Sequence, residues 1–364
     1  MLYSLLDLIV CPDCGGGLAA AFPDEVPSKT AMRTRPARRM GPAGAAVGPL
    51  PEGAGRTGLA KLVEPLSSKP VSDGRDSATE VGEGLLLCLE CESWHPVRDG
   101  LPEILPLHLR FWDEDRAWLE RFSRAVRAKS PQADPVVEYL LSRVPDEKTI
   151  SAAAAADPGA AFKIAEMSAT RRPLPEGFFG PAALAPFNPC RPQFSVDLIA
   201  RFASAVPLLR SATNGLVLDL GCGYGWTTEW LVRLGFRAVG LDLNRDYVLA
   251  GRGRMGDNRP YLVVGDAERP PLRSGCADAV LAFDAFHHVP GRRRALSELG
   301  RVLKPGGRVA MVEPGPGHEE HPGSVSAMKR HGILERGVDP AALAEDVRGT
   351  KLGHVRAHPS PEPT

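Results

Sequence analysis

Residues 215–225 read Gly215-Leu216-Val217-Leu218-Asp219-Leu220-Gly221-Cys222-Gly223-Tyr224-Gly225. A short continuous apolar run that ends in a cluster of glycines is typical of a strand buried in a parallel sheet and followed by a tight turn. Closely spaced glycines adopt unusual dihedral angles and let the backbone approach a ligand. The spacing is Gly-x-Gly-x-Gly, not the Gly-x-Gly-x-x-Gly of dinucleotide-binding turns, and this disfavours NAD.

After this turn, short apolar runs alternate with amphipathic segments. We predict strands at residues 216–220, 238–242, 261–264, 279–283 and 308–312, and helices at residues 226–234, 246–254 and 292–303. Right-handed crossovers between parallel strands then give an α/β fold with a doubly wound, mostly parallel, Rossmann-like sheet. Ligands of such sheets bind in the crevice outside the carboxyl ends of the strands.

Three carboxylates accompany the first three predicted strands: Asp219, Asp242 and Asp266. A carboxylate at a strand tip can accept hydrogen bonds from both hydroxyls of a ribose, and an acid one strand further out can accept one from an adenine amine. An acid after the second strand would suit NAD equally. Any one of the three is explained as a helix N-cap or a solvated loop acid, but three together favour a nucleoside site.

In this order the residues resemble the class I S-adenosylmethionine (SAM)-dependent methyltransferases, over about residues 215–359. The match consists of the opening strand and glycine turn, Asp242, Gly265-Asp266-Ala267 and the segment 301–307 before the fifth strand. The resemblance implies that SAM is the cofactor. It also implies which residues hold it: Asp219, Gly221, Gly223 and Gly225 at the methionine end, Asp242 at the ribose, and Asp266 with Ala267 at the adenine edge.

Methyl transfer is an in-line displacement, so alignment of the nucleophile with the methyl group does most of the work. An oxygen or nitrogen nucleophile must also lose a proton. The candidates for a catalytic base are Asp284, His287 and His288, which follow the fourth predicted strand, and Glu313 at the end of the fifth. The alternative is that one histidine packs beside the cofactor while the other is solvated.

Two Cys-x-x-Cys pairs lie near the N-terminus, Cys11 with Cys14 and Cys88 with Cys91. Four thiolates in two pairs are the ligand set of a structural zinc, and buried free thiols are the alternative. Residues 5–19 and 84–106 resemble the small zinc-ribbon family that activates tRNA and protein methyltransferases. Whether this ribbon activates catalysis, binds substrate or stabilises the chain stays open.

These patterns divide the chain into four parts. We predict a zinc-ribbon domain at 1–106 with a disordered insertion at about 19–84, a helical connecting region at 107–209, a methyltransferase domain at 210–359 and a tail at 360–364. The insertion is predicted because residues 19–84 are rich in Gly, Pro, Ala, Ser and Arg and lack periodicity.

The C-terminal residues predict a helix at 339–347 and a sixth strand at 354–358. Methyltransferases of the class that the chain resembles add a seventh, antiparallel strand, for which no sequence remains. We therefore expect a truncated chain or an incomplete sheet whose fifth strand, 308–312, exposes backbone groups that invite pairing with another chain.

Charge and composition bear on the partners. Lysine plus arginine and aspartate plus glutamate are equal at 44 each, so the chain lacks an overall positive field for nucleic acid. This favours a small-molecule or glycan acceptor, methylated on oxygen or nitrogen, over RNA bases; a catalytically idle SAM-binding scaffold is a third alternative. We expect a cytoplasmic, soluble protein that does not bind membranes, with a possible protein partner at the ribbon or the sheet edge.

Overall fold

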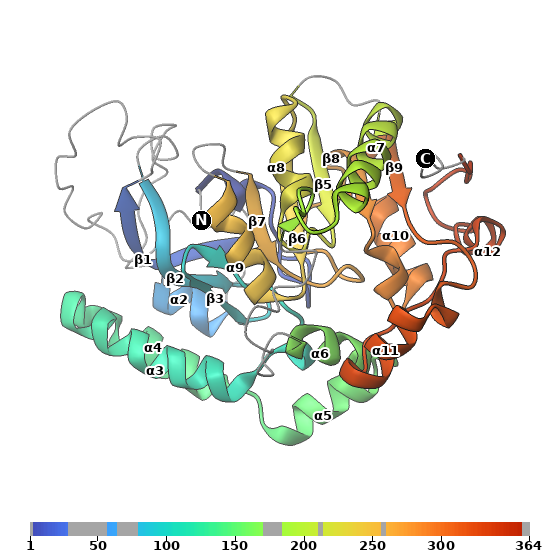
Figure 1. Ribbon diagram of the computed structural model, residues 1–364. Coiled ribbons are helices and arrows are strands. Elements are labelled where there is room, and N and C mark those ends of the chain that lie inside the picture. Colours follow the sequence, from blue (N-terminus) through green and yellow to red (C-terminus); the bar gives the residue numbers. More distant parts are fainter. Residues whose placement is uncertain are drawn as a thin grey trace. The chain divides into compact units, whose positions relative to one another are not determined.

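The computed structural model describes residues 3–27, 57–63, 79–169, 184–209, 214–255 and 260–358. They form two compact units (Figure 1). The first unit comprises Met1–Ala156 with Pro271–Arg273, and the second comprises Asp157–Pro270 with Ser274–Thr364. None of the helices in the described ranges is both long and apolar enough to cross a membrane.

The second unit is built on a five-stranded parallel sheet with the order β7-β6-β5-β8-β9 (Figure 1). Its strands are β5 (Leu216–Leu220), β6 (Arg237–Asp242), β7 (Tyr261–Val264), β8 (Ala277–Phe283) and β9 (Leu303–Val312). The predicted parallel α/β sheet is thus confirmed. The last strand begins earlier than predicted, because a register shift lets the strand continue through residues 304–307, opposite Asp278.

Helices connect and cover these strands. The three predicted crossover helices are present as α8 (Trp226–Arg233), α9 (Arg245–Arg254) and α10 (Arg292–Val302). The unit also contains α6 (Ala160–Ser168), α7 (Pro192–Leu209), α11 (Pro322–His331) and α12 (Pro340–Asp346). The side chain of Asn244 caps α9, since it accepts hydrogen bonds from the amides of Asp246 and Tyr247.

Helix α7 belongs to the core of the second unit. Its buried residues Leu198, Phe202, Ala205 and Leu209 recur every three or four positions and so share one face. The ring of Phe202 lies 5.5 Å from that of Trp226. The compact unit that contains the sheet begins at Asp157. The predicted division into a helical region at 107–209 and a catalytic domain from 210 stays a prediction.

The first unit carries a four-stranded antiparallel sheet of β1 (Leu18–Pro27), β2 (Thr79–Cys88), β3 (Trp94–Arg98) and β4 (Leu101–Pro102). Its longer helices are α2 (Gly58–Val63), α3 (Trp112–Lys129), α4 (Asp134–Ser142) and α5 (Glu147–Ala155). Strands β1 and β2 enter the predicted insertion 19–84 from both ends, and α2 lies inside it. The residues of that insertion at 28–56 and 64–78 lie outside the described ranges.

The edges of this insertion are ordered because apolar side chains pair across the two strands. Ala20 faces Leu86 and Ala21 faces Leu85, and all four are buried.

Arg110 is buried against the sheet, with its guanidinium 4.3 Å from the ring centroid of Trp94 and paired with Asp115 at 2.7 Å. Such pairing compensates the cost of burying the charge.

The predicted sixth strand is wrong. Residues 352–358 have no regular secondary structure and are mostly exposed, and β9 is the edge of the sheet in the described part of the chain. The sequence 354–358, His-Val-Arg-Ala-His, has too few apolar residues to form a buried central strand. The predicted C-terminal helix is confirmed as α12, and the predicted tail lies outside the described residues.

Two glycines of α9 give a matched test of packing. A Cβ at Gly251 would lie 2.6 Å from the backbone oxygen of Tyr224, whereas one at Gly253 would meet no atom within 4 Å. We expect Gly251→Ala to lower the free energy of unfolding by about 1–3 kcal/mol through overpacking. Gly253→Ala should raise it by roughly 0.5–1 kcal/mol through helix propensity. Urea unfolding followed by circular dichroism would check both, and equal stability of the two variants would contradict the packing argument.

Candidate active site

The glycine turn lies between β5 and α8. Gly221, Gly223 and Gly225 have φ angles of 71°, 50° and 69°, a region that side chains disfavour. A Cβ at Gly221 would overlap the side chain of Ala285, and one at Gly225 would overlap Met255, but a Cβ at Gly223 would meet no atom within 4 Å. The turn is therefore packed at both ends and open at its centre.

Asp242 is the carboxylate that the fold brings to this turn. Its Oδ2 accepts a hydrogen bond from the Gly223 amide at 2.8 Å, and its Oδ1 accepts one from the Asn244 amide at 2.8 Å. The residue is partly exposed. A carboxylate has about four lone-pair positions, so each oxygen can accept another hydrogen bond. Burial raises the pKa of Asp242 to about 6.

Asp219 faces the start of α8. The residue is buried, and its Oδ2 accepts hydrogen bonds from the hydroxyls of Thr227, at 2.7 Å, and Thr228. Burial raises the pKa of this acid to about 6 despite both hydrogen bonds. These contacts position the turn and helix, and they leave the Asp219 side chain little access to a ligand.

Asp266 is buried in an ion-pair cluster. Its Oδ2 lies 2.8 Å from the Nζ of Lys163, and its Oδ1 accepts a hydrogen bond from the Glu268 amide at 2.9 Å. The same ammonium lies 2.9 Å from Asp157 and 3.1 Å from Glu268. The neighbouring Ala267, predicted with Asp266 at the adenine edge, is partly exposed.

Sequence reasoning missed Lys163, which α6 carries into this cluster of three acids. Burial alone would lower the pKa of Lys163, but the charges and hydrogen bonds of Asp266 and its neighbours outweigh burial and raise it. The only signal in the sequence is one lysine between Phe162 and Ile164 in an otherwise apolar stretch. A lysine in such a position is usually solvated, so this signal did not single it out.

The segment after β8 brings two predicted residues, His287 and Glu313, together. The Nδ1 of His287 lies 2.8 Å from Oε2 of Glu313, and both side chains are 4% exposed. Glu313 also accepts hydrogen bonds from the amides of Ala285, Phe286 and His287. Burial lowers the pKa of His287, but the bond and charge of Glu313 outweigh it, so the pKa is raised.

The other two candidate bases differ in their surroundings. Asp284 is exposed, with a left-handed φ of 55°, and its amide donates to the Val312 carbonyl at 2.7 Å. His288 is partly exposed, and its Nδ1 donates to the Leu334 carbonyl at 2.6 Å. Their catalytic roles remain predictions.

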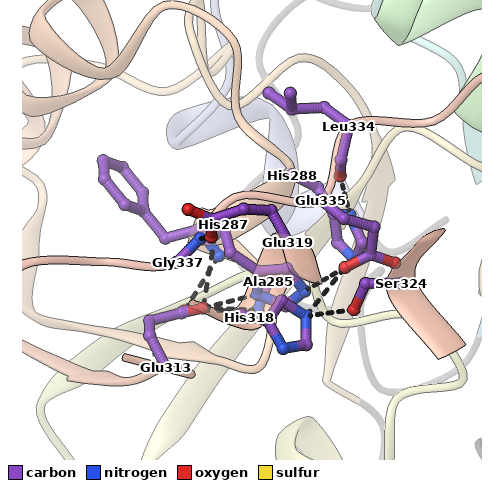
Figure 2. A network of polar contacts seen from close by, with 11 residues as sticks. Ala285, His287, His288, Glu313, His318, Glu319, Ser324, Leu334, Glu335 and Gly337 are labelled. Carbon is purple, nitrogen blue, oxygen red and sulfur yellow. Dashed lines mark hydrogen bonds and ion pairs between the residues drawn. The ribbon is translucent and has the colours of Figure 1, made fainter. Parts of the chain in front are cut away.

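Two further residues reach this segment from loops that the sequence analysis did not consider (Figure 2). His318 Nε2 lies 2.8 Å from Oε2 of Glu335, which in turn lies 3.6 Å from His287 Nε2. Glu335 follows no predicted strand, and His318 lies beyond Glu313, the residue that was considered at the end of the fifth strand, so local pattern did not place them here.

The four predicted metal ligands come together in the first unit. The Sγ atoms of Cys11 and Cys91 are 3.6 Å apart and those of Cys14 and Cys88 are 3.4 Å apart, and all four sulfurs lie within 4.8 Å of one another. Zinc–sulfur bonds of about 2.3 Å in a tetrahedron separate the sulfurs by a comparable distance. The donor set and spacing therefore fit a zinc ion. His95 Nε2 lies 3.9 Å from the Cys11 sulfur and adds to its environment.

Two family models match the chain. One, described as a methyltransferase domain, covers residues 218–311, and the other, described as Trm112p-like protein, covers residues 3–100. The first match contains Asp219, the glycine turn, Asp242 and Asp266, and the second contains all four cysteines. The chain thus contains a methyltransferase domain and an N-terminal Trm112p-like region with a four-cysteine cluster.

Individual relatives match part of this chain. The methyltransferase GfsG of Streptomyces halstedii is 32% identical over 102 residues, which are 27% of this chain and 37% of that protein. The demethylmenaquinone methyltransferase of Clavibacter sepedonicus is 37% identical over 98 residues, which are 27% of this chain and 40% of that protein. The chain therefore spans well under half the length of these relatives.

A solved complex that contains the Haloferax volcanii Trm112 methyltransferase activator is also similar. One chain of this complex aligns with a TM-score of 0.36 at 25% identity, over 41% of the present chain and 66% of the chain from the complex.

The buried Asp219 predicts a pH dependence of stability. Its pKa is about 6 in the folded protein and about 3.9 in an unfolded chain. The folded state thus binds the proton more tightly, so the contribution of this acid to stability is present below about pH 4 and is lost as the pH rises through 6. We expect the wild type to lose up to about 3 kcal/mol relative to Asp219→Asn between pH 4 and pH 7.

The measurement is the free energy of unfolding of both proteins across this pH range, without cofactor. Other acids, including Asp242, titrate in both proteins and cancel in the difference. Parallel curves for the two proteins would contradict the assigned pKa.

Proposed function

We propose that the protein is a SAM-dependent methyltransferase that transfers a methyl group to an oxygen or nitrogen of a small-molecule or glycan acceptor. The observation that carries this proposal is the pairing of Asp242 with the open centre of the glycine turn, through the Gly223 amide. A backbone turn without side chains and an acceptor carboxylate beside it suit a ligand with a ribose.

The cofactor is proposed to lie along the carboxyl ends of the strands, with its ribose hydroxyls donating to Asp242. The Gly221 to Gly225 turn faces its methionine end. Asp219 holds this turn in place relative to α8 by accepting hydrogen bonds from the hydroxyls of Thr227 and Thr228. Asp266 and Ala267 remain the proposed adenine edge, and the ion pair with Lys163 leaves the Ala267 backbone as the more accessible contact of the two.

The residues after β8 are proposed to act on the acceptor. Methyl transfer from a sulfonium requires the nucleophile, the methyl carbon and the sulfur in line. His287, oriented by Glu313, and its neighbours Asp284 and His288 are the groups that could remove the proton of the acceptor. The matched segment of the relatives supports methyl transfer, and one relative is named for a small-molecule substrate, demethylmenaquinone.

Incubation with labelled SAM tests the function directly. Purified protein would be incubated with labelled SAM and, separately, with small-metabolite, glycan and RNA fractions. Label in a metabolite or glycan fraction is the expected result. Label in RNA would favour an RNA base methyltransferase, and SAM binding without transfer to any fraction would favour a binding scaffold.

Asp242→Ala tests the cofactor site. The substitution removes hydrogen bonds to a charged acceptor, so we expect SAM binding to weaken by about 1.5–3 kcal/mol. Isothermal titration calorimetry measures the affinity, and Asp246→Ala, at an exposed acid in the same segment, is the matched control. Equal affinities of the Asp242→Ala variant and the wild type would refute the site.

We further propose that Cys11, Cys14, Cys88 and Cys91 hold one structural zinc ion. Four thiolates complete a tetrahedral shell and leave no position for a substrate. The ion would join the turn at Cys11 to the end of β2 and the turn after it, and so stabilise the Trm112p-like region. Free thiolates and zinc are compatible with the proposed cytoplasmic location.

Metal analysis tests this site. Wild-type protein should contain about one zinc per chain, and the double variant Cys11→Ser/Cys88→Ser should lose it because two of four ligands are gone. Cys190→Ser, at an exposed cysteine of the second unit, should keep the metal. A wild-type protein without zinc would overturn the proposal, and SAM binding retained in the double variant would show that the two regions act independently.

A further inference from the structure

A second group of metal-ligating side chains lies in the second unit, beside the carboxyl ends of β8 and β9 (Figure 2). His287 and His288 come from the 3-10 turn Phe286–His288 that follows β8. Glu335 comes from the loop after α11. One ligand atom from each of these three residues lies within 4.8 Å of the others.

Hydrogen bonds fix the orientation of both imidazole rings. Nδ1 of His287 is held by Glu313 at 2.8 Å, and Nδ1 of His288 donates to the Leu334 carbonyl at 2.6 Å. In a neutral imidazole, a proton on one nitrogen leaves a lone pair on the other. Each ring therefore keeps a lone pair on Nε2, and an acceptor on the opposite nitrogen is the usual support of a metal-binding histidine.

The third ligand is held in place by its own loop. Next to Glu335, Arg336 donates to the Val289 carbonyl at 2.9 Å, and the Gly337 amide donates to Glu319 at 2.9 Å. The Glu335 Oε2 atom lies 3.6 Å from His287 Nε2. Ligand atoms at about 2.1 Å from one metal lie roughly 3–3.5 Å apart. The separation between Glu335 and His287 is thus close to the spacing that one ion requires.

We propose that His287, His288 and Glu335 form a binding site for a divalent transition-metal ion such as Mn²⁺ or Fe²⁺. Two imidazoles and one carboxylate are ligands that these ions accept, and three ligands leave coordination positions open. An oxygen of the methyl acceptor can occupy an open position, where the ion lowers the pKa of a bound hydroxyl. With an ion bound, His287 and His288 act as ligands, and Asp284 is the remaining candidate base for the hydroxyl proton. This catalytic role rests on the proposed function, but the binding of the ion does not.

A proton is the competing occupant of this space. His318 Nε2 lies 2.8 Å from Glu335 Oε2 and 3.3 Å from the Ser324 hydroxyl. Hydrogen bonds from His318 and His287, if these rings are protonated, would provide the Glu335 carboxylate with partners without any metal. A direct titration with a metal distinguishes the two occupants.

Manganese is the suitable probe because Mn²⁺ prefers oxygen and nitrogen ligands and leaves a zinc-loaded thiolate cluster intact. Zinc-replete full-length protein would be titrated with Mn²⁺, and the loss of the free-ion signal followed by electron paramagnetic resonance.

We expect the wild type to bind Mn²⁺, and we expect the Mn²⁺ affinity to be at least about 10-fold weaker in Glu335→Gln. Glu313→Gln, which removes the charge of the acceptor that orients the His287 ring without removing a ligand, should weaken binding about 10-fold. Glu320→Gln, an exposed acid on the neighbouring turn His318–Glu320, is the control and should bind as the wild type does.

Two results would overturn the proposal: a wild type that leaves the Mn²⁺ signal unchanged, or Glu335→Gln and Glu320→Gln proteins that bind equally. Circular dichroism would confirm that each variant is folded, and His288→Gln replaces Glu335→Gln if the latter is not. SAM affinity would be measured on the same samples. Mn²⁺ binding without SAM binding would support the metal site and refute the proposed function. SAM binding without Mn²⁺ binding would refute the metal site and leave the proposed function standing.

Discussion

The lack of a side chain at Gly221 is the constraint on which the candidate site depends. Ala285 occupies the space that a Cβ at Gly221 would need. The amide of Gly221 also donates to the Leu241 carbonyl at 2.8 Å, next to Asp242. One backbone position thus brings together the end of β5, the end of β6 and the segment that carries His287. Any larger residue would separate these segments and also force an unfavourable φ angle.

Buried charge determines which of the three predicted acids remains available to a ligand. Asp219 accepts hydrogen bonds from threonine hydroxyls and Asp266 pairs with Lys163, while Asp242 accepts from the amides of Gly223 and Asn244 and stays partly exposed. Ion pairs such as that of Lys163 add little net stability, because desolvation offsets their attraction, but removing one partner is costly. The cluster therefore ties α6 to the end of β7 in one arrangement.

The sequence predicts the parts of this structure that depend on local pattern. Leu216–Leu220 and Tyr261–Val264 have the predicted bounds because a continuous apolar run is a strong signal of a strand buried on both faces. Local pattern does not reveal pairings between distant residues. Lys163 meets an acid 103 positions away, and Glu335 lies 48 positions from His287. The edges of the insertion were missed for the same reason, since Ala20 and Ala21 become strand residues only when the leucines of β2 face them.

Donor chemistry separates the roles of the two clusters of ligating side chains. The cysteine cluster offers four sulfur ligands, enough to complete the shell of the proposed zinc ion, so an ion there would hold chain segments together and would meet no substrate. The cluster of His287, His288 and Glu335 offers two nitrogens and one oxygen, which leave positions open. Its two histidines also follow β8, one of the strands at whose carboxyl ends the cofactor is proposed to bind. An ion with open positions can stabilise charge on an acceptor only where that acceptor meets the methyl group, and the turn after β8 and the loop after α11 are where the fold places such a ligand set.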